Sequence, residues 1–107
     1  MGDVNVIRNQ DIKRVLIGTP KDHKHSRICI ELKNGTYLVF QEATITSILR
    51  AYVTIKTHAY IRAQELEMKI ANLEQLKKDF TEQQLLETSK TYEKIEEEMG
   101  NLLQASI

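Results

Sequence analysis

The stretch that decides the predicted fold is TITSILRAYVTIKTHAYIRAQELEMKIANLEQLKKD, residues 44–79. It contains no proline or glycine, and apolar side chains recur in it at alternating steps of three and four residues. This heptad spacing lets one helix pack along another. The pattern predicts one long helix of about 54 Å, at 1.5 Å per residue. The stripe consists of Leu49, Tyr52, Ala59, Ala63, Leu66, Ile70, Leu73 and Phe80, and Lys56 and Lys77 also fall on it.

The first half of this helix, expected to begin between Glu42 and Thr46, is rich in β-branched residues, which are mediocre helix formers. The run at 51–57 would also suit a strand. Apolar residues at 45, 48, 49, 52 and 53 nevertheless share one helix face, and no turn signal follows them, so we interpret the run as helix. A lysine on the stripe either specifies the register of a helix pair or covers the stripe with its aliphatic stem while its ammonium group reaches water.

The heptad phase breaks at Phe80 and restarts at Leu85, which predicts a second, shorter helix. Residues 81–84, TEQQ, have the form of a capping box, so this helix is expected to run from about residue 82 to 99. The sequence leaves open whether the chain turns back or only kinks at Phe80, because the glycine or asparagine of a helix C-cap is missing there.

The clearest local signal is Asn34-Gly35, which separates two runs of strand-forming residues at 27–33 and 36–41. Asn-Gly supplies the two positive φ angles of a two-residue type I′ turn. We therefore expect a β-hairpin in which Leu32 opposes Tyr37. In this register one face carries Ile28, Ile30, Leu32, Tyr37 and Val39, and the other carries Cys29, Glu31, Leu38 and Phe40.

Further strand signals lie before the hairpin. A β-favouring run predicts a strand over about Lys13–Gly18, and Val4-Asn5-Val6 suits either an edge strand or a loose terminus. The predicted fold class is α+β: a small antiparallel sheet of two to four strands, a long helix and a second helix, paired as a helical hairpin or a coiled-coil dimer. We expect a single domain with a β head at 1–42 and a helical part at 43–107.

Composition restricts the class of protein. The chain has 107 residues, of which 28% are charged and 41% hydrophobic, with a net charge of zero. These values are typical neither of disordered nor of membrane proteins. The first residues lack the pattern of a secretory signal. The single cysteine, Cys29, cannot form an internal disulfide, which suits a reducing compartment. We therefore expect a cytoplasmic location and no membrane partner.

Residues capable of chemistry are sparse. Asp22-His23-Lys24-His25 brings together two imidazoles and a carboxylate, but a structural zinc site needs four ligands, so we interpret this run as a solvated loop. Cys29 suits a small buried apolar group in a strand. The sequence contains no phosphate-binding glycine loop, and no carboxylate pair stands out as an acid–base couple. We expect no catalytic residue, cofactor or metal.

Charge is unevenly distributed along the chain. Residues 1–65 carry a net charge of +4 and residues 66–107 a net charge of −4. Cations beside aromatic side chains on a small sheet can bind nucleic acid. Lysines at strand edges also keep small sheets soluble, which is the simpler interpretation. The candidate nucleic-acid contacts are Lys13, Arg14, Lys21, Lys24, Arg27 and Lys33.

The leading functional hypothesis is a non-enzymatic, oligomeric protein-interaction module. Its helices would self-associate, most simply as a homodimer, because a lone amphipathic helix is marginal in water. Its β head would be presented to an unidentified protein partner. The alternatives are a nucleic-acid-binding regulator that uses the basic β face and a small enzyme with a site at a dimer interface. The expected oligomer interface consists of Leu49, Tyr52, Leu66, Ile70, Leu73, Phe80, Leu85, Tyr92, Ile95 and Met99.

Overall fold

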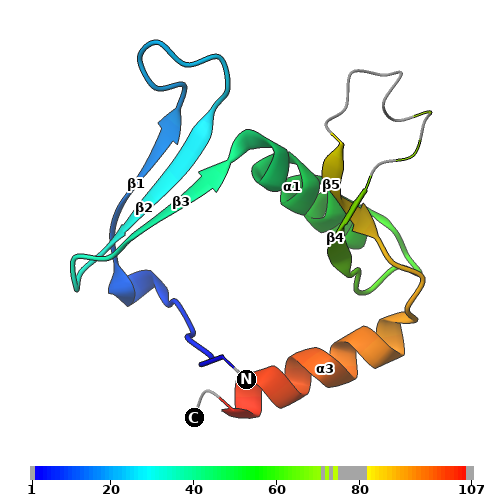
Figure 1. The fold of residues 1–107 in the computed structure, drawn as a ribbon. Helices are drawn as coiled ribbons and strands as arrows, with labels where there is room; N and C mark the ends of the chain where they lie inside the picture. The colour runs from blue at the N-terminus through cyan, green and yellow to red at the C-terminus, as the bar shows by residue number, and fades with distance from the viewer. Residues whose placement is uncertain (1, 71, 73, 75–81, 106–107) are drawn as a thin grey trace. The chain divides into compact units, whose positions relative to one another are not determined.

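A computed structural model describes residues 2–70, 72, 74 and 82–105. The chain divides into two compact units, residues 1–46 with 100–107 and residues 47–99. The α+β class is confirmed, since an antiparallel sheet is followed by a long helix and a second helix (Figure 1). The elements in order are a 3-10 turn Asn9–Asp11, β1 Ile12–Gly18, β2 Arg27–Leu32, β3 Tyr37–Gln41, α1 Glu42–Thr57, β4 Leu66–Ile70, β5 Gln83–Glu87 and α3 Tyr92–Ala105.

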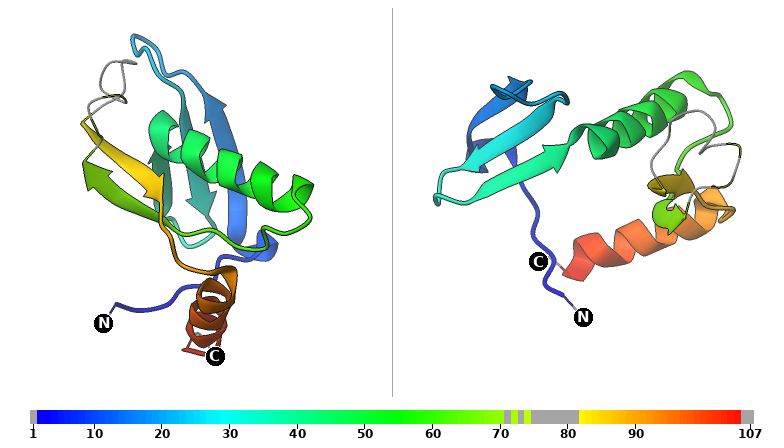
Figure 2. Two further views of the ribbon diagram at one scale, coloured as in Figure 1. Left: turned by 90° about the vertical axis from the view of Figure 1, so that its right-hand side faces the viewer. Right: turned by 45° about the horizontal axis from the view of Figure 1, so that its top comes forward.

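The first unit contains a three-stranded antiparallel sheet in the order β1-β2-β3, visible from two further directions in Figure 2. The strand predicted near Lys13–Gly18 is confirmed as β1, which begins one residue earlier. Its pairing with β2 is interrupted by a β-bulge between Ile12 and Arg14. The segment Val4–Val6 has no regular secondary structure, so of the two alternatives left open by the sequence the edge strand is not formed.

The predicted hairpin is confirmed, but its register differs by one residue. Tyr37 pairs with Glu31 rather than with Leu32, and the loop has three residues instead of two. Gly35 N–H donates to the Leu32 carbonyl at 3.0 Å, and Gly35 has a positive φ of 92°. A type I turn followed by one left-handed glycine is the usual three-residue hairpin loop. The Asn34 side chain accepts from Thr36 N–H at 2.9 Å, so asparagine supports this loop without a positive φ of its own.

The one-residue shift places each β3 side chain on the opposite face of the sheet from the predicted one, because side chains alternate along a strand. Tyr37 and Val39 lie on the same face as Glu31, and their exposures are 54% and 60%. The other face is entirely apolar, and its exposure ranges from 8% at Leu32 to 73% at Ile17. The residues of this apolar face are Ile12, Val15, Ile17, Ile28, Ile30, Leu32, Leu38 and Phe40.

Helix α1 follows β3 directly and begins at Glu42, within the predicted range. Residues 51–57 are helical, which confirms the choice of helix over strand for this run. The threonines fit the helix because their hydroxyls donate to carbonyls four residues earlier, as from Thr54 to Arg50 at 2.9 Å and from Thr57 to Val53 at 2.7 Å.

The prediction that this helix continues to residue 79 is wrong. It ends at Thr57, and Leu66–Ile70 forms strand β4, paired antiparallel with β5 at Gln83–Glu87. The residues of β4 are good helix formers by intrinsic propensity. They also alternate apolar and polar, with Leu66, Met68 and Ile70 on one face, and pairing with a second strand satisfies this alternation. Tertiary pairing therefore outweighs local propensity here.

The second helix begins ten residues later than predicted. Residues 83–87 form β5, and α3 begins at Tyr92. Thr91 precedes the helix, and its hydroxyl accepts from Lys94 N–H at 3.3 Å in the manner of an N-cap. The predicted capping box begins at Thr81, which lies outside the described residues.

Few apolar side chains are buried in either unit. Among the described residues, only Leu32, Ala63 and Ile95 are buried apolar residues, with exposures of 8%, 9% and 6%. In the same part of the chain, no helix is long and apolar enough to cross a membrane. Small cores contribute little free energy of folding, so contacts made on association would add substantially to stability.

Gly35→Ala is expected to destabilise the protein by about 1 kcal/mol, because a Cβ is disfavoured at positive φ. Space is not the cause, since nothing lies within 4 Å of the added atom. Urea unfolding would measure the change. Gly18→Ala is the matched control, because that position is equally open and has no positive φ. Equal effects at both glycines would contradict the assigned loop.

Candidate functional site

A row of three side chains crosses the first sheet near its hairpin end. Glu31 in β2 pairs with Arg14 in β1 and with Tyr37 in β3. Glu31 is only 9% exposed, and its carboxylate accepts a hydrogen bond from Arg14 Nε at 2.6 Å, with Lys13 Nζ at 3.5 Å. The Arg14 hydrogen bond holds the pKa of Glu31 below its usual range, although burial raises it. Two of the candidate nucleic-acid contacts thus neutralise a buried carboxylate.

The other candidate nucleic-acid contacts lie at two separate ends of the sheet. Lys21 and Lys24 belong to the loop between β1 and β2, beside Arg27 at the start of β2. Lys33 follows the other end of that strand, about 20 Å away for six residues. The Arg27 guanidinium donates to the carbonyls of His25 and Ser26 at 3.1 and 3.0 Å. The cations therefore do not form one patch, and nucleic-acid binding stays an untested prediction.

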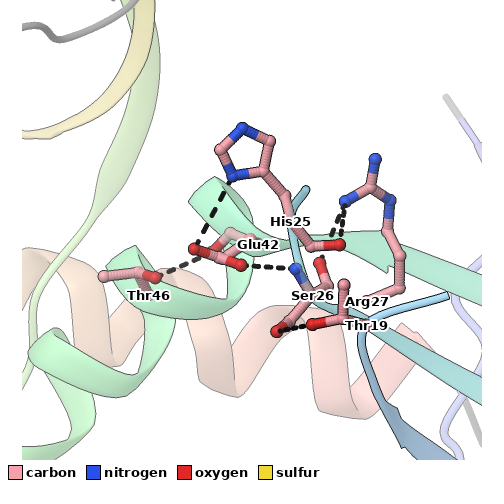
Figure 3. A network of polar contacts seen from close by, with 6 residues as sticks. All are labelled: Thr19, His25, Ser26, Arg27, Glu42 and Thr46. Carbon is pink, nitrogen blue, oxygen red and sulfur yellow. Dashed lines mark hydrogen bonds and ion pairs between the residues drawn. The ribbon is translucent and has the colours of Figure 1, made fainter. Parts of the chain in front are cut away.

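A polar network joins the start of β2 to the start of α1 (Figure 3). The Glu42 carboxylate, in the first turn of the helix, accepts a hydrogen bond from Ser26 N–H. His25 Nδ1 lies 3.9 Å from the other carboxylate oxygen. The Ser26 and Thr19 hydroxyls are 3.1 Å apart, and the Thr46 hydroxyl donates to the Glu42 carbonyl at 2.8 Å. One carboxylate thus links the sheet and the helix.

The electrostatics of Glu42 follow from this position. The Ser26 N–H lowers the pKa of the Glu42 carboxyl below its ordinary value of 4.5, and His25 and Arg27 act in the same direction. A negative charge in the first turn also complements the positive end of the helix dipole. The network therefore favours the ionised carboxylate and stabilises the junction at neutral pH.

The network also shows where the histidines of the predicted polar loop lie. His25 faces Glu42 rather than a second imidazole. Asp22 has a positive φ of 65° in the turn closed by His23 N–H and the Pro20 carbonyl at 3.1 Å. Among the described residues, no three His, Cys, Asp or Glu side chains are close enough together to hold a metal ion.

Helix α1 carries an exposed apolar strip, which we call the α1 stripe: Ile48, Leu49, Tyr52 and Val53. These residues are 49%, 55%, 56% and 54% exposed. Leu49 and Tyr52 belong to the predicted oligomer interface, and their neighbours Ile48 and Val53 extend it. Lys56 Nζ lies 5.8 Å from the centre of the Tyr52 ring, so the lysine covers the end of the stripe.

The rest of the predicted interface does not continue this stripe, because α1 ends at Thr57 and the following interface residues lie on other elements. Leu66 and Ile70 lie on β4, and Leu85 lies on β5, where it pairs with Met68. Strand side chains alternate between faces, so these residues cannot extend a helical stripe. Tyr92, Ile95 and Met99 lie on α3, whereas Leu73 and Phe80 lie outside the described residues.

Contacts within the second unit involve two of the predicted interface residues on α3, Tyr92 and Ile95. Ile95 is 6% exposed and belongs to the small core rather than to a free surface. The Arg62 guanidinium lies 4.1 Å from the centre of the Tyr92 ring and donates to Glu96 at 2.7 Å. Lys90 bridges Glu65 at 2.7 Å and Glu98 at 3.2 Å, which ties the start of α3 to the segment before β4.

Each unit has a cavity lined by described residues. The larger, of about 730 Å³, is bounded by residues 4–8 and the hairpin loop, where Arg8 and Asp11 pair with each other at 3.2 Å. The smaller, of about 220 Å³, lies between α1 and the β4–β5 pair and is lined by Ser47, Ala51 and Thr54 of the helix. The smaller cavity shows which side of α1 faces the second sheet.

Glu42→Gln is expected to lower the free energy of unfolding at pH 7, because the charged acceptor for Ser26 N–H is lost. The folded-state pKa of Glu42 is depressed, so its contribution is present above the unfolded value near 4.5 and disappears as pH falls through the lower folded value. Urea unfolding between pH 2 and 7 should show the two proteins converging at acid pH. Glu97→Gln, at an exposed carboxylate of α3, is the control. A constant difference at every pH would contradict this role.

Lys21→Glu combined with Lys24→Glu is expected to leave retention on immobilised single-stranded nucleic acid unchanged at physiological salt, because these cations form no continuous patch with Lys13 and Lys33. Salt-gradient elution would measure it, and Lys94→Glu on α3 serves as the control. A marked loss of retention in the loop variant alone would restore the basic-face hypothesis.

Comparison with known proteins gives no relative from which a role can be transferred. No family model matches the chain, and neither a curated protein nor a solved structure is significantly similar to it. Function is therefore argued from the exposed surfaces described above.

Proposed function

We propose that the chain is a non-enzymatic protein-interaction module that self-associates and holds a protein partner. The observation that supports it is the imbalance of apolar exposure. Three apolar residues are buried among the described residues, whereas large apolar side chains on β1, β3, α1, β4 and α3 are between 45% and 73% exposed. Contiguous exposed apolar surface marks sites of protein association. A chain with so small a core gains stability when such surfaces are covered.

The two units offer different surfaces for this role. The α1 stripe suits self-association because a helix presents a narrow apolar strip to another helix. The sheet offers Tyr37 and Val39 on one face and its apolar residues on the other, which suits a protein partner. We also propose a cytoplasmic location, and the support for it is the single cysteine, which suits a reducing compartment.

The nucleic-acid alternative has less support. Lys13 and Arg14 are engaged by Glu31, Arg27 caps backbone carbonyls, and the remaining candidate cations lie at opposite ends of β2. A domain that binds phosphate backbones usually gathers its cations on one face. No contact described here favours an enzyme over either binding role.

Light scattering over a range of protein concentrations and at two salt concentrations would test the proposal. The expected result is a mass that rises with concentration towards at least twice the chain mass of 12.4 kDa. Raising the salt should not reverse this association, because apolar contacts are not screened as charges are. A monomer at every concentration and at both salt levels would contradict self-association.

A further inference from the structure

We propose that the α1 stripe is the interface of a homodimer in which α1 of one copy packs antiparallel against α1 of a second copy. This inference rests on the self-association proposed above. The stripe consists of Ile48, Leu49, Tyr52 and Val53, all about half exposed.

The positions of the stripe make it complementary to its own reverse. They are symmetric about the midpoint between Arg50 and Ala51. When a second helix is turned by 180° about that midpoint, Leu49 and Tyr52 of the two copies meet at the centre of the interface, and Ile48 and Val53 lie along its two opposite edges. A twofold dimer needs such an isologous surface, in which each contact occurs twice. A large ring opposite leucine also buries apolar area at that centre.

The opposite side of α1 is already used within its own unit. Ser47, Arg50, Ala51 and Thr54 line the small cavity together with Leu66 and Leu85 of the β4–β5 pair. Small and polar residues thus face the second sheet, and the larger apolar residues of the helix face away from it. A surface helix normally turns its apolar side to its own core. In α1 the apolar side points away from the second sheet, so the α1 stripe remains open to another molecule.

Charges on the same side of the helix select the antiparallel direction. Glu42 is in the first turn and Lys56 in the last turn, at a spacing of 14 residues that places both on the side of the stripe. In an antiparallel pair, Lys56 of one copy lies about one helical turn from Glu42 of the other, at both ends of the interface. In a parallel pair the like charges meet. The Glu42 side chain is 45% exposed and so remains accessible to this lysine.

The size of the stripe sets the strength of the dimer. Stable interfaces bury about 800 Å² on each partner. Four half-exposed side chains provide less than this, so the dissociation constant should be micromolar or higher. The dimer is therefore expected to form and dissociate within the range of ordinary protein concentrations.

Cysteine cross-linking tests the direction of packing. Leu49→Cys and Tyr52→Cys would be introduced separately into chains that carry Cys29→Ala, one of them with a mass tag, and the two would be mixed and oxidised. Facing helices bring such Cβ atoms within disulfide range. The expected product is the mixed dimer that joins position 49 to position 52. A predominance of the two symmetric products, 49 to 49 and 52 to 52, would overturn antiparallel packing.

A second experiment tests the surface itself. Leu49→Gln combined with Tyr52→Gln should weaken the dimer at least about tenfold in sedimentation equilibrium, as expected for two central interface residues. Arg50→Gln is the matched control, because Arg50 lies on the side of the same helix that faces the β4–β5 pair, and this change should leave the dissociation constant unchanged. Far-ultraviolet circular dichroism reports helical content, and the cross-linking pattern decides the question if the double variant loses helix.

The outcomes separate this inference from the proposed function. A dimer that survives the double glutamine substitution, or symmetric cross-links, would overturn the α1 interface and leave self-association through another surface. A wild-type chain that stays monomeric at all concentrations would overturn both. Mixed cross-links together with a weakened double variant would support both.

Discussion

Strand pairing between Leu66–Ile70 and Gln83–Glu87 is the constraint on which the architecture depends. It uses as a strand a segment whose residues individually favour helix, so α1 cannot include residues 66–70, and the helix ends at Thr57. The shortened helix is about 24 Å long for its 16 residues. An apolar strip of this length cannot be the seam of an extended coiled coil. The same pairing places Leu66 and Leu85 opposite the small-residue side of α1, so the orientation of the helix also follows from it.

The sequence predicts those elements whose signals are local. The breaker at Gly18-Thr19-Pro20 marks the end of β1, and Asn34-Gly35 marks the hairpin. Its register is not predictable from the dipeptide, because one left-handed glycine and an asparagine side-chain hydrogen bond form a longer loop equally well. The β4 segment also fits both a helical and a strand period, and only its distant partner decides between them.

The candidate site was predictable to a similar degree. Leu49 and Tyr52 follow from helical spacing inside α1, whereas the interface residues beyond Thr57 depended on a helix that is not formed there. The Glu42 network was not predicted, although an acidic residue at a helix start is a recognisable signal. Its partner, Ser26 N–H, lies 16 residues away in sequence, and such a contact is not visible in local patterns.

The bulge between Ile12 and Arg14 protects only one half of an edge strand. It introduces Lys13 and twists that half of β1, which discourages another chain from adding a strand there. The other half, Val15–Ile17, is apolar and between 45% and 73% exposed. Edge-to-edge addition of another chain at β1 would therefore use these three residues. This open part of a strand edge thus belongs to a different element from the helix through which the protein is proposed to pair.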